Sequence, residues 1–336
     1  MSESKHSVAY AQHGGDARRI VRDEEKTGPA RRASLVAWGS LLIVWVVWGS
    51  TYLSIRVGDE TIPPLVLAGV RFLIAGLIMF PVALRQARSA ARPAGVPAGP
   101  YRPGRAEWLG CAVVGILLLG ANGAVCVGET TVPSGLTALL IATVPLWLLG
   151  IDAVLNHARL GLAPVAGLAV GLAGVGLLSG LGGGKAGVSA SGVVIILCAA
   201  AAWALGTIMA RRVRTPASPA LTSAMQLLIG GAVLLVLAAV TGEFGSFRLS
   251  GVSDRSWLAL GYLIVVGSIV AFSAYVIAVR MLPTATVATY AYVNPVIAVL
   301  LGTLILNEPV TPGMLAGGVL IVGAVILVVR RSPPAH

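Results

Sequence analysis

Aromatic rings and side-chain amides recur within long apolar stretches of this sequence, where few other side chains could bind a small molecule. Ring faces with a few hydrogen-bonding tips suit molecules that are partly apolar and partly polar. The strongest candidates are Trp48 and Trp203, which occupy equivalent places in two halves, and the run 290–295. Packing is the alternative role for each. The residues predicted to line a binding cavity are Trp48, Tyr52, Arg71, Asn122, Trp203, Gln226, Tyr275, Tyr290 and Asn294.

Arg71 is a basic residue within a predicted apolar span. Counted from Leu65, it lies about 9 Å below the membrane surface at 1.5 Å per residue. A charge at this depth needs a partner or a route to water. One role is a counter-charge for an anionic group of a bound molecule. The other, which we favour, is a structural ion pair with Glu60, Glu129 or Glu308, or a guanidinium that reaches the interface.

Asp152 is the one carboxylate that falls inside a predicted span, close to the end of that span. A carboxylate within a membrane could relay protons. An aspartate near the interface is also readily solvated, or paired with Arg159. We favour this second role, so the sequence itself gives no support to proton coupling.

Two prolines occupy equivalent positions within apolar spans. Pro145 and Pro295 are 150 residues apart. A proline removes one backbone hydrogen bond from a helix and can bend it. We predict that both prolines are hinge points of a conformational change.

The sequence lacks the motifs of common enzyme and metal sites. It has no HExxH, no GxSxG and no catalytic acid pair, and Cys111, Cys126 and Cys198 form no CxxC. These cysteines suit apolar packing. The run GGGK at 182–185 departs from a phosphate-binding loop, since Ser179 stands where the first glycine should be. We therefore expect no enzymatic activity, no cofactor and no metal.

Composition identifies lipid as the solvent of this chain. Of 336 residues, 57% are hydrophobic and 11% are charged, too much apolar surface for a water-soluble fold to cover. Crossing about 30 Å of hydrocarbon takes roughly 20 apolar residues. Residues 1–33 are polar and predict a disordered cytoplasmic tail. The predicted spans are 34–55, 65–84, 108–127, 134–154, 162–180, 191–210, 219–241, 257–279, 285–306 and 312–329.

The two halves of the chain repeat each other, which predicts two units of five spans, 34–180 and 191–330. Because five is odd, the second unit enters the membrane in the opposite sense to the first. The predicted fold class is an all-α integral membrane protein with ten transmembrane helices as two five-helix inverted repeats. One spacing of tryptophan, arginine and proline is shared by Trp48, Arg56 and Pro64 and by Trp203, Arg211 and Pro219.

The net charge of +11 follows from membrane orientation, and we expect no nucleic-acid partner. With the N-terminus in the cytoplasm, 19 of the 24 Lys and Arg residues fall on the cytoplasmic side and 4 on the outside. This is the positive-inside bias of membrane proteins. It predicts a multi-pass protein of the bacterial plasma (inner) membrane with both termini cytoplasmic.

Two segments carry a resemblance to a known family. The segment WGSTYLSIRVGDETIPPLVLAGVRFLIAG (48–76) and the segment LNEPVTPGMLAGGVLIVGAVIL (306–327) resemble the EamA-type transporters of the drug/metabolite transporter superfamily, nearest to bacterial exporters. The likeness covers 36–330 and implies ten helices in two EamA repeats, with a substrate cavity between them. An acidic residue often follows the fourth helix of such a repeat. Glu308 is that residue in the second half, but Ala158 stands in its place in the first.

Two units related by inversion can exchange conformations, which is the basis of alternating access. We expect a secondary transporter in the lipid bilayer that exports a small-molecule substrate, an organic metabolite such as an amino acid or a drug-like molecule. An importer of the same substrates and a membrane-embedded signalling or scaffold protein are the alternatives. Glycines four residues apart, Gly167 with Gly171 and Gly313 with Gly317, predict close helix packing within a repeat or at a homodimer face.

Overall fold

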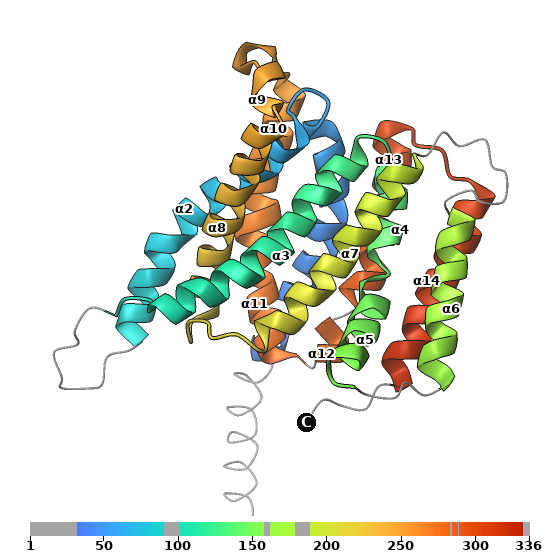
Figure 1. Ribbon diagram of the computed structural model, residues 1–336, viewed down its shortest axis with the longest axis horizontal. Helices are drawn as coiled ribbons and strands as arrows, with labels where there is room; N and C mark the ends of the chain where they lie inside the picture. The colour runs from blue at the N-terminus through green and yellow to red at the C-terminus, as the bar shows by residue number, and fades with distance from the viewer. Residues whose placement is uncertain are drawn as a thin grey trace, which may run out of the picture.

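The computed structural model describes residues 32–90, 101–157, 162–178, 189–282, 284–287 and 289–331. These residues form a bundle of helices without a β-strand (Figure 1). In chain order the elements are the first helix (Arg32–Gly58), α2 (Pro64–Ala90), α3 (Arg105–Glu129), α4 (Ser134–Ile141), α5 (Val144–Leu155), α6 (Leu162–Leu178), α7 (Ala190–Ala210), α8 (Pro219–Val240), α9 (Glu243–Ser246), the 3-10 turn η1 (Leu249–Gly251), α10 (Asp254–Tyr262), the π-helix η2 (Leu263–Val270), α11 (Ala271–Met281), α12 (Thr284–Val287), α13 (Tyr290–Leu306) and α14 (Pro312–Arg331).

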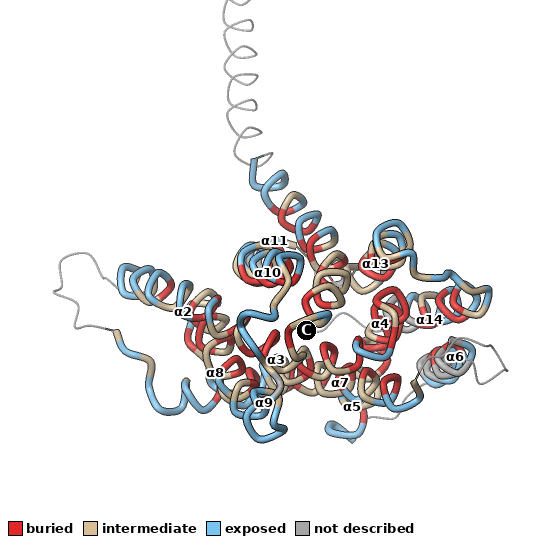
Figure 2. The backbone as a smooth tube through the Cα atoms, turned by 90° about the horizontal axis from the view of Figure 1, so that it is seen from above, coloured by how far each residue is buried: buried red, intermediate tan, exposed pale blue. Residues whose placement is uncertain are grey.

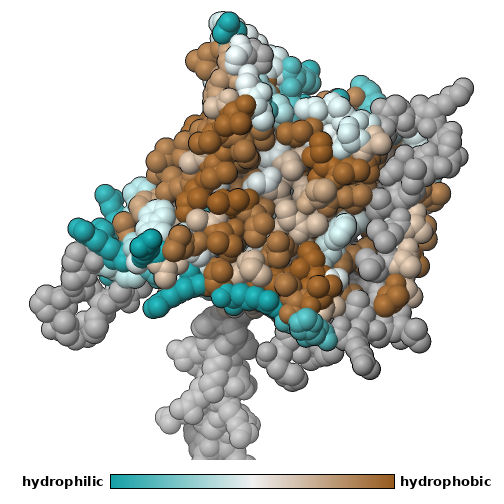
Figure 3. Space-filling model, viewed as in Figure 1, coloured by the Kyte–Doolittle hydropathy of each residue, from teal (hydrophilic) through white to brown (hydrophobic). Residues whose placement is uncertain are grey.

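Seven helices in the described part of the chain are long and apolar enough to cross a membrane, counting α4 with α5 and α10 with the π-helix as single spans. They coincide with seven of the ten predicted spans. The other three predicted spans coincide with the apolar helices α6, α13 and α14. Large hydrophobic side chains are exposed along the sides of the bundle, and Figure 3 shows them as a broad brown surface with hydrophilic residues toward the ends. The chain is therefore a multi-pass membrane protein.

Three of the predicted spans are divided into more than one helical segment. The span 134–154 breaks at Ala142 and Thr143, so that Pro145 lies in the first turn of α5, where its missing N–H costs nothing. The span 257–279 passes through the π-helix η2, and the span 285–306 is divided into α12 and α13. Pro295, in contrast, lies inside α13. The two equivalent prolines thus occupy different places relative to the breaks.

Short polar signals set where several helices begin. Ser218 precedes α8 and its hydroxyl accepts the Leu221 N–H at 3.4 Å, with Pro219 as the first helical residue. Ser253 caps α10 in the same way, accepting the Ser256 N–H at 3.2 Å. Such caps satisfy N–H groups that have no partner within the helix. They fix the start of two helices that contribute to the bundle interior.

Helices from the two halves pack against each other in equivalent pairs. The pair α2 and α8 lies at one side of the bundle and the pair α6 and α14 at the other, with α4 against α13 (Figure 2). Glycines allow the close approach in the second pair, since a Cβ on Gly174 would lie 2.9 Å from the Gly317 carbonyl oxygen and one on Gly313 would lie 3.3 Å from that of Leu177. In the described residues Gly313 and Gly317 thus pack against the other half, whereas we expected packing within one repeat or at a dimer face. Gly171 does pack within its own half, since a Cβ there would overlap the Leu146 side chain of α5.

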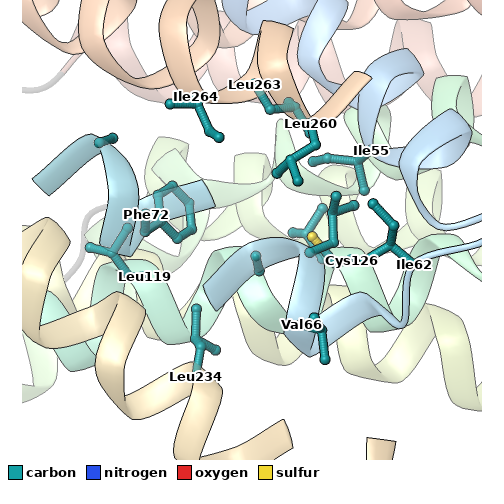
Figure 4. Close-up of a cluster of buried hydrophobic side chains, with 14 of the residues drawn as sticks. Ile55, Ile62, Val66, Phe72, Leu119, Cys126, Leu234, Leu260, Leu263 and Ile264 are labelled. Carbon is teal, nitrogen blue, oxygen red and sulfur yellow. The ribbon is translucent and has the colours of Figure 1, made fainter. Parts of the chain in front are cut away.

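The main apolar core lies between α2, α3, α8 and the α10–η2 span. Phe72, Leu119, Leu234 and Leu263 are buried there, and Figure 4 shows side chains from these elements converging. Close packing of this kind holds broken spans in register because a shift of one helix would open cavities around its neighbours.

We predict that Gly76→Ala destabilises the bundle by about 1–3 kcal/mol, the usual cost of overpacking. A Cβ at Gly76 would lie 2.7 Å from the backbone nitrogen of Leu228, so α2 and α8 would have to separate. Thermal unfolding in detergent is the measurement. Gly120→Ala is the matched control, since a Cβ there meets nothing within 4 Å and alanine favours helix. Equal melting temperatures for the two variants would contradict this packing.

Candidate functional site

Four of the predicted cavity residues come together in an aromatic cluster, which we define as Trp48, Trp203, Phe272, Tyr275 and Tyr290. The Trp48 ring lies 5.6 Å from Phe272, 5.1 Å from Tyr275 and 5.3 Å from Tyr290, measured between ring centroids. Tyr275 and Tyr290 are 6.3 Å apart, and the Trp203 and Tyr290 side chains are close enough to interact electrostatically. The cluster therefore joins the first helix to α7, α11 and α13.

Phe272 is the member of this cluster that we did not predict. It lies three residues before Tyr275, on the same face of α11. Residues three or four apart are neighbours on a helix surface. That spacing could have identified Phe272, but only once Tyr275 had been placed in a cluster.

Asn294 is buried on α13, with 6% of its surface exposed. With its side-chain amide assigned the orientation that satisfies both neighbours, its nitrogen donates to the carbonyl oxygens of Trp45 and Tyr290, both at 3.1 Å. Trp45 belongs to the first helix, so Asn294 ties α13 to the first helix beside the aromatic cluster. Asn294 therefore fixes the backbone at Trp45 and Tyr290, while the residues of the aromatic cluster supply the ring surfaces.

The remaining predicted residues lie around this cluster with varied partners. Tyr52 interacts electrostatically with Glu129 and Tyr290. The Asn122 amide donates to the Leu118 carbonyl of its own helix at 3.2 Å. Gln226 is half-buried on α8, where its backbone passes Gly115 of α3. Tyr52 thus lies near Glu129, and the side-chain amide of Asn122 is bonded to the backbone of its own helix.

Arg71 is only 3% exposed and links the two halves. Its Nε donates to the Ser268 hydroxyl at 2.9 Å, and its guanidinium lies 4.6 Å from the centre of the Phe72 ring. Ser268 belongs to the π-helix η2, whose wider turn is uncommon and often occurs at functional sites. The partner of Arg71 in the described residues is therefore a hydroxyl of the second half.

Glu308 caps a helix of the opposite half. One carboxylate oxygen accepts the Ser134 N–H at 2.9 Å, and the other accepts the Ser134 hydroxyl at 2.9 Å and the Gly135 N–H at 3.2 Å. These groups form the first turn of α4, where a negative charge is stabilised by the helix dipole and by charge-assisted hydrogen bonds. Gly302 makes room, since a Cβ there would overlap the Glu308 carboxylate and lie 2.8 Å from the Ser134 hydroxyl.

Further hydrogen bonds between the halves gather at the same end of the bundle, which we call the Glu308 end. Glu243 accepts the Leu65 and Val66 N–H groups, at 3.0 and 3.1 Å, in the first turn of α2. The Thr61 hydroxyl donates to Ser256 at 2.8 Å. Figure 1 shows this end at the top, with α9 and α10 on one side and the end of α13 on the other.

The opposite end of the bundle shows fewer such links in the described residues. Arg212 donates to the Asn156 side chain at 2.7 Å across the halves. Asp152 is exposed there and accepts from the Asn156 amide at 2.8 Å, while Arg159 lies outside the described residues. The cross-half hydrogen bonds are thus concentrated at the Glu308 end.

The EamA-like transporter family model matches residues 36–180 and again residues 190–330. The chain belongs to the EamA-like transporter family. It is a membrane transporter of the drug/metabolite transporter superfamily, as the resemblance implied, and is not an enzyme.

Relatives with similar sequences are named as transporters. The chain is 38% identical over 301 residues to the "Uncharacterized inner membrane transporter YedA" of Escherichia coli K12, covering 88% of this chain and 92% of that protein. It is 28% identical over 306 residues to the "Uncharacterized transporter YvbV" of Bacillus subtilis, covering 90% and 93%. It is 27% identical over 305 residues to the "Probable amino-acid metabolite efflux pump" of Salmonella typhimurium, covering 85% and 92%.

A solved crystal structure has a similar fold. It matches with a TM-score of 0.56 and 22% sequence identity, over 88% of this chain and 96% of that chain. At this identity the likeness shows the fold alone.

We predict that Gly302→Ala lowers the thermal stability of the EamA protein by displacing the Glu308 carboxylate from α4, at a cost of about 1–3 kcal/mol. The matched control is Gly150→Ala, because a Cβ at Gly150 meets nothing within 4 Å. If displacement of Glu308 is the cause, the same alanine should cost far less in a Glu308→Ala background. Fully additive losses would contradict this explanation.

Proposed function

We propose that this protein is a secondary transporter that exports small organic metabolites, amino acids or drug-like molecules, by alternating access. The observation that carries the proposal is the aromatic cluster, in which Trp48 of the first half meets Tyr275 and Tyr290 of the second. A site built from both halves changes shape when the halves move. This is the requirement for releasing a substrate on the other side of the membrane.

The pairing of equivalent helices supports an architecture of two inverted repeats, 34–180 and 191–330, with ten transmembrane helices. The pairs α2 with α8, α4 with α13 and α6 with α14 each join corresponding spans of the two proposed repeats. A pseudo-twofold axis in the membrane plane would place corresponding spans side by side in this way. On this arrangement, the two states of the transporter have similar packing and similar energy.

Substrate class and direction rest on the printed names of relatives and on the chemistry of the cluster. One relative is named as a probable amino-acid metabolite efflux pump, and aromatic rings suit amino acids and drug-like molecules. For Arg71, the hydrogen bond to Ser268 favours the structural role over that of a counter-charge for an anionic substrate. Pro145, at the break before α5, and Pro295, inside α13, are the proposed hinges of the motion.

The distribution of basic residues supports an inner-membrane orientation with both termini in the cytoplasm. In that orientation the Glu308 end faces the outside. The hydrogen bonds across that end then correspond to a state closed to the outside.

The orientation predicts that a cysteine at Ser250, which is exposed in η1, reacts with an impermeant thiol reagent in intact cells. A cysteine at Arg212, exposed at the opposite end, should react only after permeabilisation. Each cysteine is introduced into a variant from which the native cysteines have been removed. The reverse pattern would overturn the orientation and place the Glu308 end in the cytoplasm.

The cluster predicts that Trp48→Ala reduces transport at least tenfold while Trp48→Phe keeps part of it, because the ring surface is what binds. Trp38→Ala is the matched control, since Trp38 lies on the same helix but is 50% exposed on the outer surface. Metabolites released by cells with and without each variant identify the substrate, and proteoliposome assays then give its rate. Equal effects of the Trp48 and Trp38 changes would remove the cluster from the site, and accumulation inside cells would indicate import.

A further inference from the structure

Four buried or half-buried carboxylates lie at the Glu308 end among the described residues: Asp59, Glu129, Glu243 and Glu308. Two of them have strong hydrogen-bond donors. Glu243 accepts N–H groups from the first turn of α2, and Glu308 accepts them from the first turn of α4. A carboxylate at a helix N-terminus is stabilised in its ionised form.

Asp59 and Glu129 lack such donors. Within the described residues, none of the four carboxylate oxygens on this pair has a hydrogen-bond partner. Glu129 is 0% exposed, so its carboxylate is out of reach of the bulk solvent in this state. An ionised carboxylate buried in this way is strongly unfavourable.

The nearby guanidinium groups are engaged elsewhere. Arg56, on the first helix, donates to the backbone carbonyl oxygen of Glu129 and not to its side chain. Arg71, on α2, donates to Ser268. Both arginines still attract a negative charge on Glu129 over a longer distance, and Arg56 does so for Asp59.

The other groups that act on this pair oppose its ionisation. Asp59 and Glu308 repel a charge on Glu129, and Glu243 repels one on Asp59. With all carboxylates ionised, four negative charges would face the two positive charges of Arg56 and Arg71, an excess of two. Two protons, one each on Asp59 and Glu129, would balance the charges. Of the other titratable neighbours, Cys126 of α3 interacts electrostatically with both carboxylates, and Tyr52 of the first helix interacts with Glu129.

We propose that Asp59 and Glu129 form a proton-binding site, and that closing the Glu308 end of the transporter takes up protons at this pair. The proposal rests on the alternating access set out above. When the Glu308 end opens, water reaches both carboxylates and they ionise. When it closes, they are buried again and each must bind a proton. Acid then favours the closed state, and alkali favours the open one.

The pKa of the aspartate outside the spans agrees with this direction. Burial raises the pKa of Asp59 well above its ordinary value, with Arg56 opposing and Glu243 adding to the effect. Burial also raises the pKa of Glu243, although the Val66 and Leu65 amides oppose it. The carboxyl pKa is then higher in the closed state than in the open state, where it is about 4. The stabilisation of the closed state by protons is complete below pH about 4 and is lost as the pH rises through the raised pKa of the closed state.

The test is a spin-label distance measurement across the Glu308 end, between Thr130 and Val310, both exposed. The native cysteines Cys111, Cys126 and Cys198 are replaced by alanine. From about pH 4 to pH 9, the ratio of closed to open populations should fall by up to tenfold per pH unit for each proton released. Glu129→Gln should reduce the dependence of the population ratio on pH at neutral and alkaline pH. Asp59→Asn should do the same, and it serves as the test if Glu129→Gln fails to fold.

Two controls isolate the pair. Glu60→Gln changes an exposed carboxylate beside Asp59 and should leave the slope unchanged. Asp152→Asn changes an exposed carboxylate at the opposite end of the bundle and should also leave the slope unchanged. A population ratio independent of pH in the unsubstituted protein would overturn the proposal, as would equal slopes for Glu60→Gln and Glu129→Gln. No substrate is present, so failure here leaves the export proposal standing, and failure to find export leaves this result standing.

Discussion

Hydrocarbon offers no hydrogen bonds, so the N–H groups that have no partner at the start of a membrane helix must be satisfied from within the protein or at the interface. At the start of the span 134–155 they are satisfied by one side chain of the other half. Glu308 supplies acceptors to the start of α4 at Ser134 and Gly135, and Gly302 leaves the space it needs. The same carboxylate therefore completes a helix and holds two halves of the bundle together.

This interaction connects the Glu308 end of the bundle to the candidate substrate site. Tyr290 starts α13 and Glu308 follows its other end, so movement of that helix alters both places. Asn294, on the same helix, anchors it to the first helix beside Trp48. We infer that opening the Glu308 end repositions the aromatic cluster, which is how a change in access would be coupled to a change in affinity.

Hydropathy and repeated spacing predicted the membrane class, and the resemblance of segments 48–76 and 306–327 predicted the family, because both depend on local sequence. Trp48, Trp203 and Tyr290 were predicted only as candidates to line a cavity, and the structure places the Trp48 ring 5.3 Å from that of Tyr290. Partners in space were harder to predict. The π-helix changes which residues of the span 257–279 share a face. The sequence therefore did not predict the hydrogen bond between Arg71 and Ser268. Glu129 lies just beyond the predicted span 108–127, and its complete burial depends on neighbours distant in sequence.

The most direct test of the link between the halves is a double-mutant cycle on Glu308 and Ser134. The free energy of unfolding is measured for Glu308→Gln, Ser134→Ala and the double variant. We expect a coupling energy of about 0.5–3 kcal/mol, as found for groups in direct contact. Glu308→Gln paired with Asp152→Asn, at the opposite end, should be additive. Additivity for Glu308 and Ser134 as well would contradict the claim that this carboxylate joins the halves.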